Sequence, residues 1–134
     1  MALSFTSKKL ALVADDDPAT LEIYEMALVD LGLFPILTRE SGEVMENVFT
    51  RDLSLVILDQ QMPGITGLEL VRQIRASTNS DRRDVPIIMV TADRTVEQAA
   101  ARAGVTACLE KPFDVEDLIR LVLDLTRDDA ALSA

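Results

Sequence analysis

Short apolar runs alternate along this chain with longer segments whose apolar residues lie three or four positions apart. The first pattern is typical of buried strands and the second of amphipathic helices. The apolar runs predict five strands, at Leu10–Ala14, Phe34–Thr38, Leu53–Leu58, Pro86–Val90 and Ala107–Leu109. The helical spacing predicts five helices, at Pro18–Leu31, Ser41–Thr50, Leu68–Ala76, Arg94–Ala103 and Asp114–Arg127.

Cap and turn residues support these boundaries. Asp17 followed by Pro18 is a favourable helix start, because Asp accepts hydrogen bonds from free N–H groups and proline fits the first helical position. Gly32 is expected to end that helix, and Ser41 to cap the next one. The polar segment Ser77–Val85 predicts a long surface loop.

The first predicted helix has more apolar residues than one core-facing stripe requires. The helical spacing assigns the core to Ile23, Tyr24, Ala27, Leu28 and Leu31. Leu21, Met26 and Val29 are then expected outside this stripe, where they either contribute to a surface that docks a helical partner or are ordinary scattered surface residues.

The predicted strands are almost wholly apolar, which indicates that helices cover both faces of their sheet. Strands that alternate with helices form parallel sheets with right-handed crossovers. We therefore expect an α/β fold, a doubly wound (βα)5 three-layer sandwich with a five-stranded parallel sheet. The second strand is expected at an edge, because no distinctive polar residue follows it.

Polar residues follow four of the predicted strands. Asp15, Asp16 and Asp17 come after the first strand, Asp59 after the third, Thr91 after the fourth and Lys111 after the fifth. In a parallel sheet the carboxyl ends of all strands lie at one edge, where ligands bind. The sequence therefore predicts a cluster of carboxylates with one hydroxyl and one ammonium group.

The chemistry of this cluster favours a phosphoryl group bound beside a divalent cation. Neighbouring carboxylates repel one another unless a cation intervenes, and Mg²⁺ prefers oxygen ligands. An ammonium and a hydroxyl group suit phosphoryl oxygens, and a carboxylate can itself become the phosphorylated nucleophile. Lys111 stands out because the only other lysines are Lys8 and Lys9.

Composition narrows the class of protein. A length of 134 residues, 49% of them hydrophobic, suits one domain with a substantial core. The formal net charge of −10 disfavours direct binding to nucleic acid or to an anionic membrane surface. No histidine is present, which excludes histidine-dependent hydrolytic triads and histidine zinc ligands, and the single cysteine excludes a disulfide framework. With no apolar run of membrane-spanning length and no apolar signal core, a cytoplasmic location is expected.

Four motifs give the chain a specific resemblance. They are Val13–Pro18 (VADDDP), Leu58–Gly64 (LDQQMPG) with Gly67, Val90–Ala92 (VTA) and Lys111–Phe113 (KPF). In this order and spacing, the chain resembles the receiver domain of bacterial two-component response regulators over residues 8–127. The fold expected on this basis is flavodoxin-like, with strand order 2-1-3-4-5, in a single domain over residues 1–134 whose tails fray.

The resemblance implies a phosphorylation-activated signalling switch. Asp59 would accept a phosphoryl group from a phosphohistidine, and Mg²⁺ would be held by Asp15, Asp16, Asp59 and the backbone carbonyl of Gln61. Thr91 and Lys111 would contact the phosphoryl group. The resemblance also implies a cis peptide bond between Lys111 and Pro112.

The expected partners follow from the same resemblance. They are a sensor histidine kinase or histidine phosphotransfer protein as donor and an output protein that is bound through protein–protein contacts. A homodimer through the fourth helix, the fifth strand and the fifth helix is a further expectation. The chain would act as a stand-alone or excised receiver rather than as a dedicated enzyme, although it would catalyse its own phosphoryl transfer and dephosphorylation.

The sequence departs from the family pattern at one position that concerns switching. Cys108 stands three residues before Lys111, where the family has an aromatic switch residue. We therefore expect the signal to pass through the loop Ala92–Thr95 and its helix instead of through a rotating side chain. Thr66 replaces a frequent Asp and is expected to affect only a turn.

Two alternative functions are compatible with parts of the pattern. Asp15 and Asp17 have the spacing of the nucleophile motif in haloacid-dehalogenase-type phosphohydrolases, for which Asp15 would be phosphorylated. The chain would instead be a pseudo-receiver, a binding module without phosphorylation, if Mg²⁺ and phosphodonors had no effect on it.

Overall fold

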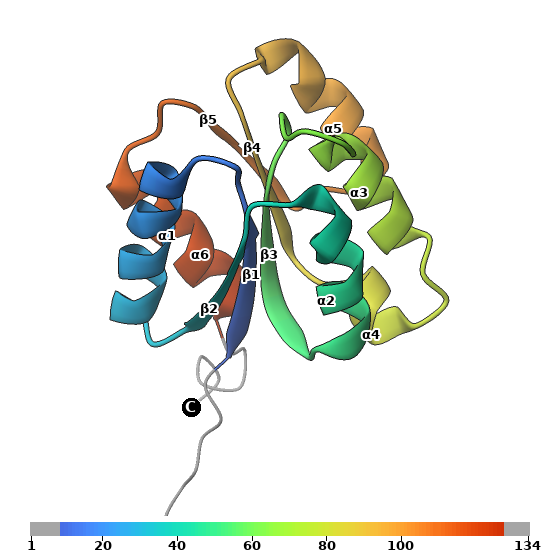
Figure 1. Ribbon diagram of the computed structural model, residues 1–134, viewed down its shortest axis with the longest axis horizontal. Helices are drawn as coiled ribbons and strands as arrows, with labels where there is room; N and C mark the ends of the chain where they lie inside the picture. The colour runs from blue at the N-terminus through green and yellow to red at the C-terminus, as the bar shows by residue number, and fades with distance from the viewer. Residues whose placement is uncertain (1–8, 128–134) are drawn as a thin grey trace, which may run out of the picture.

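The computed structural model describes residues 9–127 as one parallel sheet with helices on both faces (Figure 1). The strand order is β2-β1-β3-β4-β5, and all neighbouring pairs are parallel. This confirms the expected doubly wound fold, its strand order and the edge position of the second strand. The strands are β1 Leu10–Ala14, β2 Phe34–Thr38, β3 Leu53–Asp59, β4 Ile87–Thr91 and β5 Ala107–Glu110.

The helices form the two outer layers. They are α1 Pro18–Asp30, α2 Val44–Thr50, α3 Gly67–Arg75, α4 Ser80–Arg83, α5 Glu97–Ala103 and α6 Val115–Thr126, with 3₁₀ turns η1 Ser41–Glu43 and η2 Arg94–Val96. Helices α1 and α6 cover one face of the sheet, and α2, α3 and α5 cover the other (Figure 1). No helix of residues 9–127 is long and apolar enough to cross a bilayer.

Two apolar cores lie on the two faces of the sheet, because successive side chains of a strand point to opposite faces. In β3, Leu55 and Ile57 pack with α1 and α6, whereas Val56 and Leu58 pack with α2, α3 and α5. All four side chains are fully buried. This two-sided burial explains why the strand is apolar at consecutive positions.

Helix α1 begins as the sequence indicates. Asp17 accepts a hydrogen bond from the N–H of Ala19 at 3.2 Å, and Pro18 occupies the first helical position. Beyond the helix, Gly32 has a φ of +83°, a conformation that residues with a Cβ atom rarely adopt.

The expected division of apolar residues along α1 is wrong at two positions. Leu21 is buried in the core, although it was expected outside the core-facing stripe, and Ile23 is exposed. Met26 and Val29 lie at the surface as expected. Apolar residues surround much of this helix, so their spacing alone does not define which side faces the sheet.

Two local predictions are also wrong. The segment Ser77–Val85 is not a loop throughout, because it contains α4, which starts where the Asn79 side chain accepts a hydrogen bond from the N–H of Asp81 at 3.0 Å. Ser41 does not cap the second helix: it is the first residue of η1, which is followed by the shorter helix α2.

Candidate functional site

Asp15, Asp59 and Lys111 meet at the carboxyl edge of the sheet. Asp59 ends β3, Asp15 directly follows β1, and Lys111 directly follows β5. The Lys111 ammonium donates to Asp15 Oδ2 at 2.9 Å and to Asp59 Oδ2 at 3.0 Å. The Asp15 side chain is fully buried and that of Asp59 is 7% exposed, whereas that of Lys111 is 25% exposed. One quarter-exposed cation therefore bridges two buried anions.

The second oxygen of each buried carboxylate accepts a hydrogen bond from the backbone. Asp15 Oδ1 accepts from the N–H of Asp17 at 2.9 Å, and Asp59 Oδ1 accepts from the N–H of Gln61 at 3.1 Å. These bonds fix the rotation of both carboxylates, because the two oxygens of each have partners from different directions. Gln61 thus contacts Asp59 through its N–H, and the role expected for its carbonyl stays a prediction.

Asp16 adds a third carboxylate to the cluster. One ligand atom each from Asp15, Asp16 and Asp59 lies within 4.8 Å of the others, and Asp16 is the most exposed of the three. A single ammonium leaves this group with an excess of negative charge. A set of three carboxylates around a partly open space suits a hard divalent cation.

Burial and charge act on the pKa values of the cluster in opposite directions. Burial raises the pKa of Asp59, and Asp15 adds to this, while Lys111 and the N–H of Gln61 oppose it. Burial lowers the pKa of Lys111, but the hydrogen bonds that its ammonium donates to Asp15 and Asp59, together with their negative charges, outweigh this, and the net direction is upward. The pKa values of Asp59 and Lys111 are thus both raised. This agrees with one ammonium that is shared between two carboxylates, because Lys111 has two anionic partners whereas Asp59 has only a share of one cation.

Thr91 ends β4 beside these residues, and its hydroxyl group faces its own loop. Thr91 Oγ1 accepts a hydrogen bond from the N–H of Asp93 at 3.0 Å and donates to the Asp93 carbonyl at 3.4 Å. Asp93 Oδ1 in turn accepts from the backbone and the hydroxyl of Thr95, at 2.9 and 2.6 Å. A chain of hydrogen bonds thus connects Thr91 to the start of η2.

The peptide bond between Lys111 and Pro112 is cis, as the resemblance implies. Phe113 then stacks on Tyr24 of α1, with ring centroids 5.5 Å apart. Such aromatic pairs stabilise beyond their buried area. The contact fixes the segment that carries Lys111 against the helix that follows Asp15.

The loop between β3 and α3 depends on two small residues. A Cβ atom at Gly67 would lie 2.9 Å from the Asp59 carbonyl oxygen, so only glycine allows this approach. Ser41 Oγ donates to the Pro63 carbonyl at 3.0 Å and accepts from the N–H of Ile65 at 3.1 Å. The sequence gives no signal for this role of Ser41, because its partners are more than twenty residues away.

Thr66 and Cys108 have structural roles close to their own positions in the chain. Thr66 caps α3 by accepting a hydrogen bond from the N–H of Glu69 at 3.2 Å, which fits the expected turn role. Cys108 is a partly buried free thiol that packs beside the core of the α2, α3 and α5 layer. Burial raises the pKa of this thiol, and Glu97 adds to the effect, so it is not an activated nucleophile.

A sequence profile of the response regulator receiver domain matches residues 11–123. The chain belongs to this family. It is therefore a receiver domain of the type that occurs in two-component response regulators and in sensor kinases. The family membership decides against a haloacid-dehalogenase-type phosphohydrolase, which was the first alternative.

Two curated relatives show the contexts in which this domain occurs. The sensory/regulatory protein RpfC of Xanthomonas campestris pv. campestris is 32% identical over 116 residues, covering 85% of this chain and 16% of RpfC. The response regulator MprA of Mycobacterium leprae is 34% identical over 128 residues, covering 91% of this chain and 54% of MprA. The chain thus spans about half of MprA and a smaller part of RpfC.

Solved structures show the same fold. The chemotaxis response regulator CheY4 of Vibrio cholerae matches with a TM-score of 0.80 and 26% identity, covering 89% of this chain and 99% of that one. The receiver domain of the Pseudomonas aeruginosa sensor histidine kinase PA1611 matches with a TM-score of 0.81 and 24% identity, covering 91% and 100%. That structure has a magnesium ion coordinated in its active-site cleft.

Proposed function

We propose that Asp59 is the phosphoacceptor of this receiver domain and takes a phosphoryl group from a phosphohistidine on a partner protein. The observation that carries this assignment is the Lys111 ammonium, which bridges Asp59 and Asp15 at 3.0 and 2.9 Å. This contact places a positive charge where a phosphoryl group on Asp59 would develop negative charge.

In the proposed transfer a carboxylate oxygen of Asp59 attacks the phosphorus atom. The new O–P bond forms as the P–N bond to the donor imidazole breaks, and the electron pair of that bond stays with the imidazole nitrogen. Lys111 neutralises phosphoryl charge, and the N–H of Gln61 holds Asp59 in position. No histidine of this chain takes part, because it has none.

Mg²⁺ is the proposed cofactor. The carboxylates of Asp15, Asp16 and Asp59 and the backbone carbonyl of Gln61 would hold it, and their excess of negative charge fits a divalent cation. When bound, Mg²⁺ would neutralise charge on the transferring phosphoryl group. The magnesium ion in the related PA1611 receiver structure supports this proposal.

The first test is labelling of the purified protein with acetyl phosphate. We expect one phosphoryl group per chain, labile to hydroxylamine, on the peptide that contains Asp59. The label should require Mg²⁺, and Asp16→Ala should reduce it, because Asp16 completes the carboxylate set. Intact-protein and peptide mass spectrometry measure both effects. A chain that takes no label with or without Mg²⁺ would be a pseudo-receiver, and the proposal would be wrong.

The proposed switch starts at Thr91. After phosphorylation, its hydroxyl group would leave Asp93 and donate to a phosphoryl oxygen, which releases the hydrogen bonds that connect Thr91 to the loop Ala92–Thr95. A phosphoryl group changes a two-state equilibrium only if it interacts differently with the two states, and Thr91 provides that difference. Cys108 has no ring to rotate.

The second test compares Thr91→Ala with Cys108→Ala. We expect phosphorylation to shift the backbone amide signals of Ala92–Thr95 and α5 in NMR spectra of wild type and of Cys108→Ala. In Thr91→Ala these shifts should fall by more than half at equal labelling, and Thr91→Ser should restore them because it keeps the hydroxyl group. If Cys108→Ala abolishes the shifts while Thr91→Ala retains them, the side chain at position 108 transmits the signal.

The remaining proposals concern the whole protein. The donor is a sensor histidine kinase or a histidine phosphotransfer protein, and the output is a phosphorylation-dependent contact with another protein or domain. The chain would act as a single receiver domain located in the cytoplasm, and the fraying expected of its two tails concerns residues outside the described range 9–127. A homodimer would use α5, β5 and α6, the elements equivalent to those named from the sequence.

A further inference from the structure

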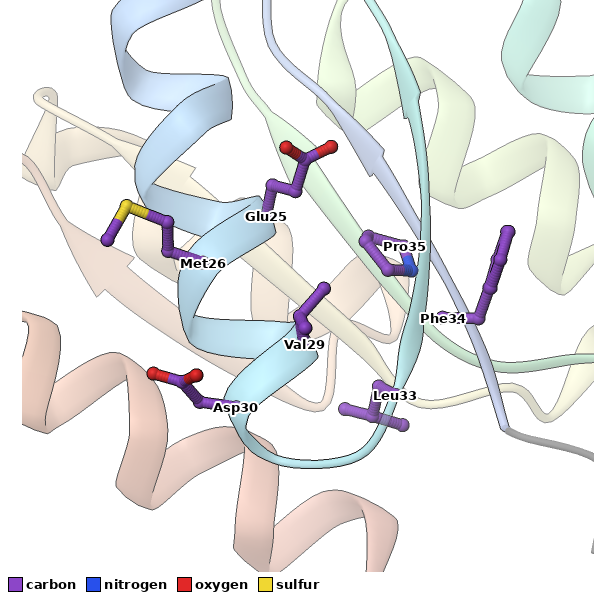
Figure 2. A pocket seen from close by; sticks show the side chains of 7 residues that line it. All are labelled: Glu25, Met26, Val29, Asp30, Leu33, Phe34 and Pro35. Carbon is purple, nitrogen blue, oxygen red and sulfur yellow. The ribbon is translucent and has the colours of Figure 1, made fainter.

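A groove lies between α1 and β2, away from the phosphoacceptor. It has a volume of about 480 Å³ and is lined by four side chains of the second half of α1 and by Leu33, Phe34 and Pro35 (Figure 2). Helix α1 runs back from the carboxyl edge of the sheet, and β2 starts at Phe34. The groove is therefore at the opposite edge of the sheet from Asp59, and a partner could occupy it without covering the phosphorylation site.

Three large apolar side chains are exposed along the groove. Met26, Val29 and Phe34 are 69%, 52% and 53% exposed, and Leu33 is buried at the turn between α1 and β2. Val29 faces Pro35 across the groove (Figure 2). Contiguous apolar patches on a soluble domain commonly mark sites of protein–protein contact.

Acidic residues on α1 favour a partner that carries positive charge. Helix α1 contains Glu22, Glu25 and Asp30 and has no lysine or arginine. Glu25 and Asp30 lie on either side of Val29 along the helix (Figure 2), and within residues 9–127 neither forms an ion pair. Complementary charge selects partners and suppresses wrong ones, so a basic segment is favoured.

The free edge of β2 is poorly suited to adding another strand. The N–H of Phe34 points inward to the β1 side and donates to the carbonyl of Lys9, the residue before β1, at 2.8 Å. Because residues of a strand alternate in direction, Pro35 occupies an outward-facing position and has no N–H to donate. This favours an occupant whose own backbone hydrogen bonds are internal, which is a helix.

We propose that the groove between α1 and β2 binds an amphipathic helix of a partner protein. Its apolar side chains would pack against Val29, Pro35 and Phe34, and its lysine or arginine side chains would pair with Glu25 and Asp30. This docking site is independent of the proposed phosphorylation of Asp59, so the failure of either proposal leaves the other intact.

The test uses a model helical peptide of leucine, alanine and lysine, with the leucines on one face and lysines beside them. Titrated into ¹⁵N-labelled protein, it should shift the amide signals of α1 and β2 while those around Asp59 stay in place. Phe34→Ser and Val29→Ser should each weaken binding about tenfold, because each removes one partly buried apolar contact. Glu25→Gln combined with Asp30→Asn should remove most of the salt dependence of binding.

Matched controls distinguish binding in this groove from nonspecific binding of the peptide to other exposed apolar residues. Phe49→Ser on α2 and Leu123→Ser on α6 change residues that are 50% and 49% exposed, and neither should alter peptide affinity. A peptide with glutamate in place of lysine should not bind. Equal losses in the control variants, or shifts centred on Asp59, would overturn the proposal. So would a wild-type dimer that Phe34→Ser converts to monomer in sedimentation experiments, because the occupant would then be a second copy of the chain.

Discussion

Asp59→Asn is expected to reduce phosphoryl labelling to background while the protein stays folded. The amide has nearly the size of the carboxylate and can still accept a hydrogen bond from Lys111, but it is not an anionic nucleophile. Burial raises the pKa of Asp59, which means that the charged carboxylate is disfavoured at this position. The variant should therefore unfold at a temperature no lower than wild type in divalent-free buffer.

The matched control is Asp52→Asn, an exposed carboxylate immediately before β3. It should retain full labelling by acetyl phosphate with Mg²⁺. Mass spectrometry of both variants, together with thermal unfolding followed by circular dichroism, separates loss of the nucleophile from loss of the fold. Labelling that persists in Asp59→Asn and maps to Asp15 would assign the nucleophile to the first strand and contradict our assignment.

The layers of this domain and the edge position of β2 could be predicted from the residue pattern, whereas the full strand order followed from the family resemblance. Strands buried on both faces are apolar at successive positions, as in β3 and β4, and they alternate regularly with helices. The meeting of Asp15, Asp59 and Lys111 could be predicted for the same reason, since parallel strands bring their ends to one edge. These three side chains lie close together because the strands that carry or precede them are parallel neighbours or near neighbours in one sheet.

Features that depend on particular tertiary contacts could not be predicted. Ser41 was expected to be a helix cap, but its hydroxyl group bridges the loop at Pro63 and Ile65 because η1 packs beside it. Leu21 and Ile23 were assigned to the wrong sides of α1, since apolar residues occupy several faces of that helix. The Thr91 hydroxyl group accepts a hydrogen bond from the N–H of Asp93, and sequence spacing does not reveal this partner.

Lys111→Met is expected to lower the free energy of unfolding by about 3 kcal/mol in divalent-free buffer near neutral pH. Methionine keeps most of the side-chain volume but leaves the buried carboxylates of Asp15 and Asp59 facing each other without a cation. Breaking a buried ion pair from one side typically costs about 3–5 kcal/mol. The lower end of that range applies because the Lys111 side chain is 25% exposed.

Two conditions should reverse part of this loss. Mg²⁺ should stabilise Lys111→Met because it supplies the missing positive charge, by about 2.7 kcal/mol at a hundredfold excess over its dissociation constant. A lower pH should also reduce the loss of stability in Lys111→Met. The pKa of Asp59 is raised in the folded wild-type protein, and loss of Lys111 raises it further, so the folded state binds a proton more readily than the unfolded state. Stability is then lost as pH rises through the folded pKa, and the deficit should shrink as pH is lowered from neutral toward that raised pKa.

Urea unfolding of wild type, Lys111→Met and Lys9→Met measures these effects under matched conditions. Lys9 is an exposed lysine that donates to the Thr126 carbonyl at 2.8 Å, so its replacement should change the unfolding free energy by about 0.5 kcal/mol or less. A Lys111→Met protein as stable as wild type at neutral pH without Mg²⁺ would mean that Asp15 and Asp59 do not need a cation between them. The electrostatic basis of the proposed Mg²⁺ site would then be wrong, because the same excess of carboxylate charge is what attracts the ion.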